Sequence, residues 1–118
     1  MARKRNTEYF LIRNAEGQCN YSNKGFVDTP HYISRATVKY RVQDMVMHVA
    51  RWFKPGDPHD RQRLQHLLGV KITVFYFNEA TGEMILDQSY SPMSIVEFCE
   101  KFNIQETLDK MKRLEPFI

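Results

Sequence analysis

Apolar residues recur at three- and four-residue steps between residues 38 and 53, and this is the strongest pattern along the chain. Such spacing places them on one face of a helix. The apolar stripe consists of Val38, Val42, Met45, Val46, Val49, Trp52 and Phe53. Ser34 stands where an N-cap residue would begin such a helix. The pattern therefore predicts a helix over residues 35–53, with Trp52 in the core.

A different period governs the first 30 residues. Residues 8–14 ("EYFLIRN") are rich in aromatic and aliphatic side chains and run into a turn that contains Gly17. Residues 18–22 then indicate a returning strand, and Phe26–Val27 a third short one. Pro30 ends the segment, because proline cannot donate to a sheet hydrogen bond. This part of the chain predicts an N-terminal β-hairpin or a three-stranded meander.

The middle of the chain predicts a short helix followed by a second hairpin. Asp57 precedes a proline, which is the usual start of a helix, and residues 58–68 continue it until a glycine. Residues 70–77 ("VKITVFYF") are β-branched and aromatic, as in a central strand. Residues 84–90 return as its antiparallel partner.

Two short helices are predicted at the C-terminal end. Ser94 and Glu97 have the spacing of a capping box, and Asn103 interrupts the apolar pattern that follows. The apolar positions are Ile95, Phe98, Cys99, Phe102, Leu108, Met111 and Leu114. The whole chain thus predicts a single α+β domain over residues 8–118. Its antiparallel sheet combines the N-terminal hairpin or meander with the central hairpin, and it packs against one long and several short helices.

Residues 94–114 resemble the helix-turn-helix of small bacterial and phage regulators. The would-be recognition helix begins with Gln105, Glu106 and Asp109, however, and acids there would face DNA phosphates. The step from Ile104 to Leu108 is also four residues, where that motif usually has five. We interpret these helices as a cover for the sheet and keep a DNA-binding regulator as a third hypothesis.

Charge is unevenly distributed along the 118 residues, whose formal net charge is +3. Arg3, Lys4 and Arg5 lie in an N-terminal segment, residues 1–7, that we expect to be a disordered basic tail. Residues 35–63 hold seven basic and three acidic residues, and residues 64–118 hold five basic and eight acidic ones. The chain is therefore polarised rather than uniformly basic.

The basic helical segment supplies the candidate binding residues. These are Arg35, Lys39, Arg41, His48, Arg51, Lys54, Arg61 and Arg63. If the two helices that carry them lie side by side, several of these residues share one surface. Such a surface suits RNA, single-stranded DNA, a nucleotide or an acidic protein.

Catalytic and metal-binding patterns are missing from the sequence. Neither a phosphate-binding loop nor a nucleophile elbow occurs. His59 and His66 are two helical turns apart, too far to share one zinc ion, and Cys99 falls on an apolar helix face. We expect neither an enzyme, a metal nor a cofactor. Two widely spaced cysteines and short apolar runs indicate a cytoplasmic protein with reduced thiols that does not enter a membrane.

Residues 8–45, "YFLIRNAEGQCNYSNKGFVDTP" followed by "SRATVKYRV", resemble a layout of small phage-encoded accessory proteins. In these, a strand, a glycine turn and a tyrosine-bearing return strand precede a helix opened by a serine and basic residues. The resemblance implies a context: many such proteins take over host machinery or block host defence by binding it, without chemistry. It assigns no functional residue.

Three functions are therefore expected, in order. The first is a non-enzymatic binding protein that inhibits or redirects a host defence protein in the host cytoplasm. Its polarised charge also suits head-to-tail self-association into a homo-oligomer. The second is nucleic-acid or nucleotide binding through residues 35–63, and the third is DNA regulation through residues 94–114.

Overall fold

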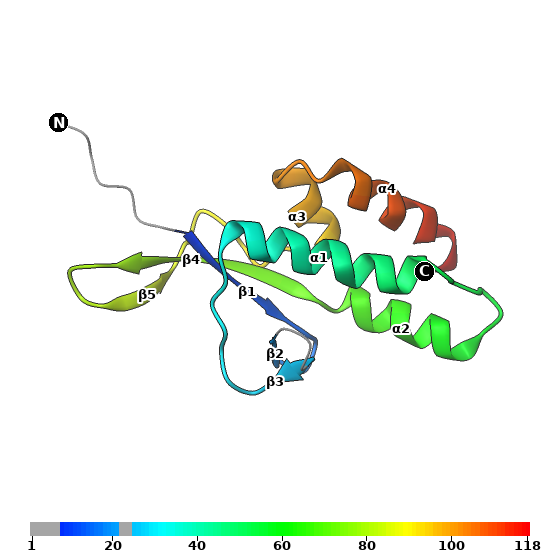
Figure 1. The fold of residues 1–118 in the computed structure, drawn as a ribbon, viewed down its shortest axis with the longest axis horizontal. Coiled ribbons are helices and arrows are strands. Elements are labelled where there is room, and N and C mark those ends of the chain that lie inside the picture. The colour runs from blue at the N-terminus through cyan, green and yellow to red at the C-terminus, as the bar shows by residue number, and fades with distance from the viewer. Residues whose placement is uncertain (1–7, 22–24) are drawn as a thin grey trace.

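The computed structural model describes residues 8–21 and 25–118, and the expected disordered tail lies outside them. Within these residues five strands form one sheet that packs against four helices (Figure 1). The elements are β1 (Glu8–Arg13), β2 (Cys19–Asn20), β3 (Phe26–Val27), α1 (Arg35–Ala50), α2 (Pro58–Leu68), β4 (Lys71–Asn78), β5 (Glu83–Leu86), α3 (Ile95–Lys101), α4 (Gln105–Leu114) and the 3₁₀ turn η2 (Glu115–Phe117). The predicted α+β fold is confirmed.

The sheet joins the two halves of the chain in the order β3-β2-β1-β4-β5, and all its neighbouring strands are antiparallel. At its centre β1 pairs with β4 from Glu8↔Tyr76 to Arg13↔Lys71. The N-terminal meander and the central hairpin thus form one sheet, as expected. β5 is shorter than predicted because the carboxylate of Asp87 accepts a hydrogen bond from the Ser89 amide at 2.9 Å and turns the chain.

Only one face of the sheet joins the main core. Successive strand residues point to opposite faces, and residues paired across strands share a face. Phe10 and Ile12 of β1 and their partners Val74 and Ile72 of β4 are buried in one cluster with apolar residues from all four helices. The residues next to these in sequence point to the opposite face.

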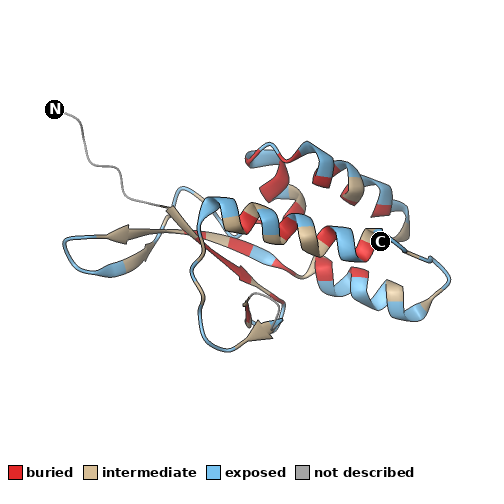
Figure 2. Cartoon of the chain, viewed as in Figure 1, coloured by how far each residue is buried: buried red, intermediate tan, exposed pale blue. Residues whose placement is uncertain are grey.

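The buried residues follow the inner sides of the helices and the middle of β1 and β4 (Figure 2). The outer part of the β4–β5 hairpin is different, because no residue from 75 to 92 is fully buried. This hairpin extends away from the helices in Figure 1. The core therefore occupies the end of the sheet that the helices cover.

α1 begins where it was predicted and ends earlier. The side chain of Ser34 accepts a hydrogen bond from the Thr37 amide at 3.2 Å, so Ser34 is the N-cap. The helix stops at Ala50, and the chain turns at residues 51–52. Trp52 therefore leaves the apolar stripe and is 74% exposed, so its predicted place in the core is wrong.

The first of the two C-terminal helices is capped as predicted, and the two helices pack differently from each other. Ser94 and Glu97 form the capping box, and Asn103 adopts a left-handed conformation (φ 58°) between α3 and α4. α4 lies chiefly along α1, whereas α3 contacts β4. The pair therefore fills the core as interpreted, but α4 covers a helix rather than the sheet.

Candidate functional site

The eight predicted basic residues lie in several different surroundings. At the start of α1, Arg35 pairs with Glu8 of β1, and its guanidinium lies 4.9 Å from the centre of the Phe102 ring. Arg41 donates a hydrogen bond to the side-chain oxygen of Asn20 at 3.0 Å. Both side chains therefore serve contacts that tie α1 to the sheet.

A second group lies between α1 and α2, which do pack side by side. Arg63 donates to the backbone oxygen of His48 at 2.8 Å and lies 3.7 Å from Asp60. His48 and Arg63 line a hollow of about 410 Å³ together with His59, His66 and apolar side chains that include Phe26. This hollow is apolar and its arginine is already engaged, so it offers little free positive charge.

The remaining members are scattered. Lys39 is half-buried on α1, and Lys54 lies in the exposed connection between α1 and α2. Arg61 donates to the backbone oxygen of Pro55 at 3.3 Å. Arg51 immediately follows α1 and lines a different hollow from the His48–Arg63 pair. The structure thus places Arg51 apart from the His48–Arg63 pair instead of on one surface with it.

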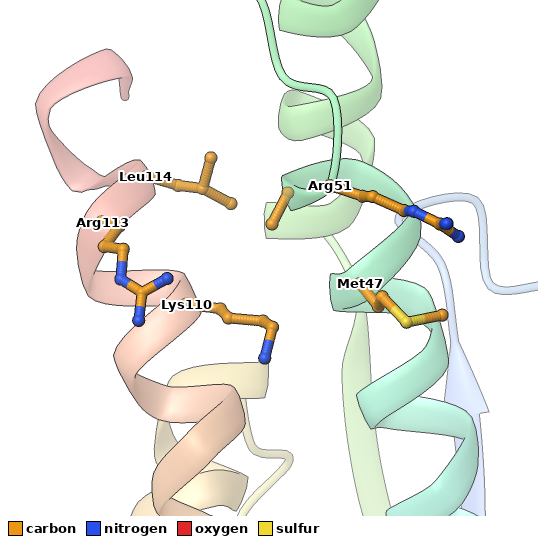
Figure 3. Close-up of a pocket in the computed structure, with 6 residues that line it drawn as sticks. Met47, Arg51, Lys110, Arg113 and Leu114 are labelled. Atoms are coloured by element: carbon orange, nitrogen blue, oxygen red, sulfur yellow. The ribbon is translucent and has the colours of Figure 1, made fainter.

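Arg51 has neighbours that the sequence analysis did not select. A hollow of about 370 Å³ between α1 and α4 is lined by Met47, Ala50, Arg51, Lys110, Arg113 and Leu114 (Figure 3). In this view Lys110 and Leu114 reach from α4 toward α1, and Arg51 extends away from α4. We name these six residues and the adjacent Trp52 the α1–α4 face.

Positive charge surrounds an apolar floor on the α1–α4 face. Three cations and no carboxylate line the hollow, and the Glu106 carboxylate lies 3.4 Å from the Lys110 ammonium. The Glu106 side chain is 88% exposed, and an exposed pair of this kind contributes little. The face therefore attracts a carboxylate or a phosphate, with room for apolar atoms beside it.

Exposed apolar groups flank this positive charge. Trp52 is 74% exposed, and the Arg51 guanidinium lies 5.5 Å from the centre of its ring. On the outer side of α1, Met47 is 36% exposed, and Tyr40, two helical turns earlier, is 66% exposed. Trp, Tyr, Met and Arg are the residues enriched at the centre of protein–protein interfaces.

Sequence reasoning missed the α1–α4 face because this face exists only where α4 packs along α1, and the sequence does not show which surface α4 covers. Lys110 and Arg113 lie toward the end of α4, where cations commonly offset the helix dipole, so their charge does not by itself indicate a site. The apolar stripe of α4, including Leu108 and Met111, packs equally well on a sheet or on a helix. The only local signal was Pro55 followed by Gly56, which predicts that the helix ends soon after Phe53. This signal does not predict where the side chain of Trp52 lies.

The start of α4, which would contact DNA in a helix-turn-helix, carries no positive charge. The exposed start of α4 carries Gln105, whose amide donates to Asp109 at 2.8 Å, and Glu106. Eight apolar residues of the two helices and their turn belong to the core cluster: Ile95, Phe98, Cys99, Phe102, Ile104, Leu108, Met111 and Leu114. DNA regulation through residues 94–114 stays a prediction.

Both cysteines are free thiols, and both are buried. Cys99 is 1% exposed in the core. Burial and, to a smaller extent, the neighbouring Glu100 carboxylate together raise the pKa of the Cys99 thiol from 9.0 to about 11. A thiol that stays protonated is a poor nucleophile, so Cys99 fits the core better than catalysis.

The raised pKa of Cys99 predicts a specific alkaline loss of stability. Below the ordinary pKa of 9.0 the thiol is protonated in both the folded and the unfolded chain, so pH has no effect through it. Between pH 9 and about 11 only the unfolded chain ionises, which favours unfolding. Urea denaturation across this range should show the stability advantage of wild type over Cys99→Ala narrowing as pH rises. A constant difference would contradict a buried, protonated thiol.

Among residues 8–21 and 25–118, no three histidine, cysteine or acidic side chains are arranged to hold a metal ion. Of the helices described, none is both long and apolar enough to cross a membrane.

Comparisons with models of protein families, with curated proteins and with solved structures gave no match.

Proposed function

We propose that the chain is a non-enzymatic binding protein that docks on an acidic surface of another protein through the α1–α4 face. In the context that the resemblance to phage accessory proteins implies, this partner is a host defence protein that is inhibited or redirected in the cytoplasm. The observation that supports the proposal is the apolar hollow between two helices, lined by Arg51, Lys110 and Arg113 and flanked by an exposed Trp52.

The shape and chemistry of this face favour a protein partner over a nucleic acid. Met47, Ala50 and Leu114 give the hollow an apolar floor that accepts an aliphatic or aromatic side chain. The cations then meet a carboxylate beside that side chain. Glu106 and Asp109 lie exposed on α4, the helix that carries Lys110 and Arg113, and would repel a continuous phosphate backbone.

The experiment that tests the proposal is affinity capture from a lysate of a candidate bacterial host. The immobilised full chain is incubated with two halves of one lysate, and one half is first treated with nuclease. We expect one protein to be retained in stoichiometric amount from both halves. A net positive rim should also make its capture weaken as salt concentration rises.

Two results would contradict the proposal. Capture that disappears after nuclease treatment would favour the second function, nucleic-acid or nucleotide binding through residues 35–63. In that case charge reversal at Arg41 should weaken nucleic-acid binding as strongly as reversal at Arg51. A strictly monomeric chain by light scattering that retains nothing would contradict both a protein partner and self-association.

A further inference from the structure

The sheet has a second face, on the side away from the main core. Its central residues are Tyr9, Leu11 and Arg13 of β1 with their partners Phe75, Thr73 and Lys71 of β4, and we name these six the free sheet face. Their sequence neighbours Phe10, Ile12, Ile72 and Val74 point into the core. Among the described residues, no helix contributes to the core on this side. The middle of the face is nevertheless covered, because Leu11 is fully buried and the Thr73 hydroxyl is buried, so only the two ends of the face are accessible.

Aromatic rings lie next to one another on the two central strands of this face. Tyr9 and Phe75 are direct partners across β1 and β4, and both are partly exposed. Leu86 of β5 is the partner of Phe75 on the other side and is 46% exposed. Tyr32 meets the Phe75 ring edge-on, at 5.2 Å and 83°, and remains 38% exposed. These rings form a shallow apolar platform that water reaches.

Positive charge marks one end of the platform. Arg13 and Lys71 are direct partners four residues along the strands from the Tyr9–Phe75 pair, and Lys71 is exposed. Four residues of strand correspond to about 13 Å. A short extended chain can therefore reach from the platform to the two cations by passing over the covered Leu11–Thr73 pair between them.

Acidic side chains of the described strands avoid this face. Glu8 and its partner Tyr76 are next in sequence to Tyr9 and Phe75, so they point to the opposite face. Glu83 and its partner Asn78 point the same way as Tyr76, because Asn78 lies two residues further along β4. Hydrogen bonds with Ser94 lower the pKa of the Glu97 carboxyl on α3 most, and Lys71 lowers it to a smaller extent. Lys71 is therefore close to this carboxylate. The strand residues of the free face thus carry two positive charges and no negative one.

We propose that the free sheet face binds single-stranded nucleic acid, with bases stacked on Tyr9 and Phe75 and the backbone phosphates near Arg13 and Lys71. Stacking on aromatic side chains tolerates any base, and cations along the strand path hold the backbone. RNA-binding sheets with aromatic residues on two neighbouring strands stack two or three bases in this way. A duplex cannot be accommodated equally, because its bases are already stacked on each other.

The charge distribution favours this occupant over a second copy of the chain or an apolar protein. An apolar partner would bring no negative charge to Arg13 and Lys71, whereas a nucleic-acid strand supplies phosphates and flat rings together. The site is also separate from the α1–α4 face, since it lies on the sheet side that the helices leave open. If the nucleic-acid proposal failed, the proposal of a protein partner on the α1–α4 face would therefore still stand.

The test is fluorescence anisotropy with a labelled twelve-nucleotide oligo(U) and oligo(dT), with a duplex of equal length as competitor. We expect both single strands to bind and the duplex to compete poorly. Two phosphate contacts predict a slope of about −1.4 in log K against log salt concentration. Absence of binding at 50 mM salt, or equal competition by the duplex, would overturn the proposal.

Variants assign the binding to this face. Lys71→Glu should weaken binding about tenfold or more, and Tyr9→Ala roughly fivefold to a hundredfold because stacking is lost. Arg51→Glu, a charge reversal on the α1–α4 face, should leave the affinity unchanged. Thermal melts establish that each variant is folded, and photo-crosslinking of wild type to oligo(U) should label β1 or β4.

Other occupants give distinct results. A dimer by light scattering that Tyr9→Ala converts to a monomer, without nucleic-acid binding, would assign the face to a second copy and overturn the proposal. Loss of oligonucleotide binding in Arg51→Glu with no loss in Lys71→Glu would move the nucleic-acid site to α1 and overturn it as well.

Discussion

Arg51→Glu is expected to abolish retention of the protein partner while leaving the fold intact. Arg51 is exposed just beyond the end of α1, and no carboxylate lines its hollow. A glutamate there would replace one of the three cations that line the hollow with an anion, and so weaken the attraction for a partner's carboxylate. Desolvated charge contacts of this kind commonly contribute 2 kcal/mol or more, which corresponds to roughly a thirtyfold loss of affinity.

Matched variants separate binding from folding in this experiment. Lys71→Glu makes the same charge change on the free sheet face and should retain the partner fully. Trp52→Ala should lose most of the binding, because an exposed tryptophan beside an arginine is a typical interface hot spot. Capture from the nuclease-treated lysate, quantified by band intensity for each variant, is the measurement. Equal retention by Arg51→Glu and wild type would place the binding site elsewhere.

Phe98→Ala is expected to cost about 3–5 kcal/mol of the free energy of unfolding. The Phe98 side chain is fully buried, with its ring centre 6.2 Å from that of Phe10 and 4.7 Å from that of Phe102. These three rings connect β1 to α3, so the cavity would open where sheet and helices meet. Since domains of this size unfold with about 5–15 kcal/mol, the variant should be only marginally folded.

Urea denaturation followed by circular dichroism measures this loss. Phe98→Leu should cost clearly less, because leucine fills more of the cavity than alanine does. Trp52→Ala is the opposite control: it removes a larger side chain, but one that is 74% exposed, so its cost should stay near or below 1 kcal/mol. A cost for Phe98→Ala as small as that of Trp52→Ala would show that the aromatic cluster does not organise the core.

Local chemistry in the sequence predicted where most elements begin. Ser34, Asp57 and Ser94 all cap helices through their own side chains, as their positions indicated. Such caps depend on residues within three positions of each other, so the sequence alone contains the information. The ends were harder to predict. The apolar spacing of α1 runs on to Trp52 and Phe53, but the helix stops at Ala50 and only Phe53 packs inward, against Phe117.

The candidate sites depended on tertiary contacts that no local pattern contains. α1 lies between α2 on one side and α4 on the other, so Arg51 and His48 line different hollows although they are three residues apart. The free sheet face was missed for a similar reason. "VKITVFYF" predicts a strand apolar on both sides, and only the placement of every helix on one side shows that Phe75 is partly exposed.

The central strand pair has a consequence for how the chain reaches its native state in the cell. Glu8 and Tyr76 are partners although 68 residues separate them, so β1 must wait for β4 to be synthesised. At about 5–20 residues per second this delay is roughly 3–14 s. Phe10, Leu11 and Ile12 meanwhile stay uncovered, in reach of chaperones and of other nascent chains. The contiguous helices α1 and α2 bring only nearby residues together, so they can form before β1 pairs with β4.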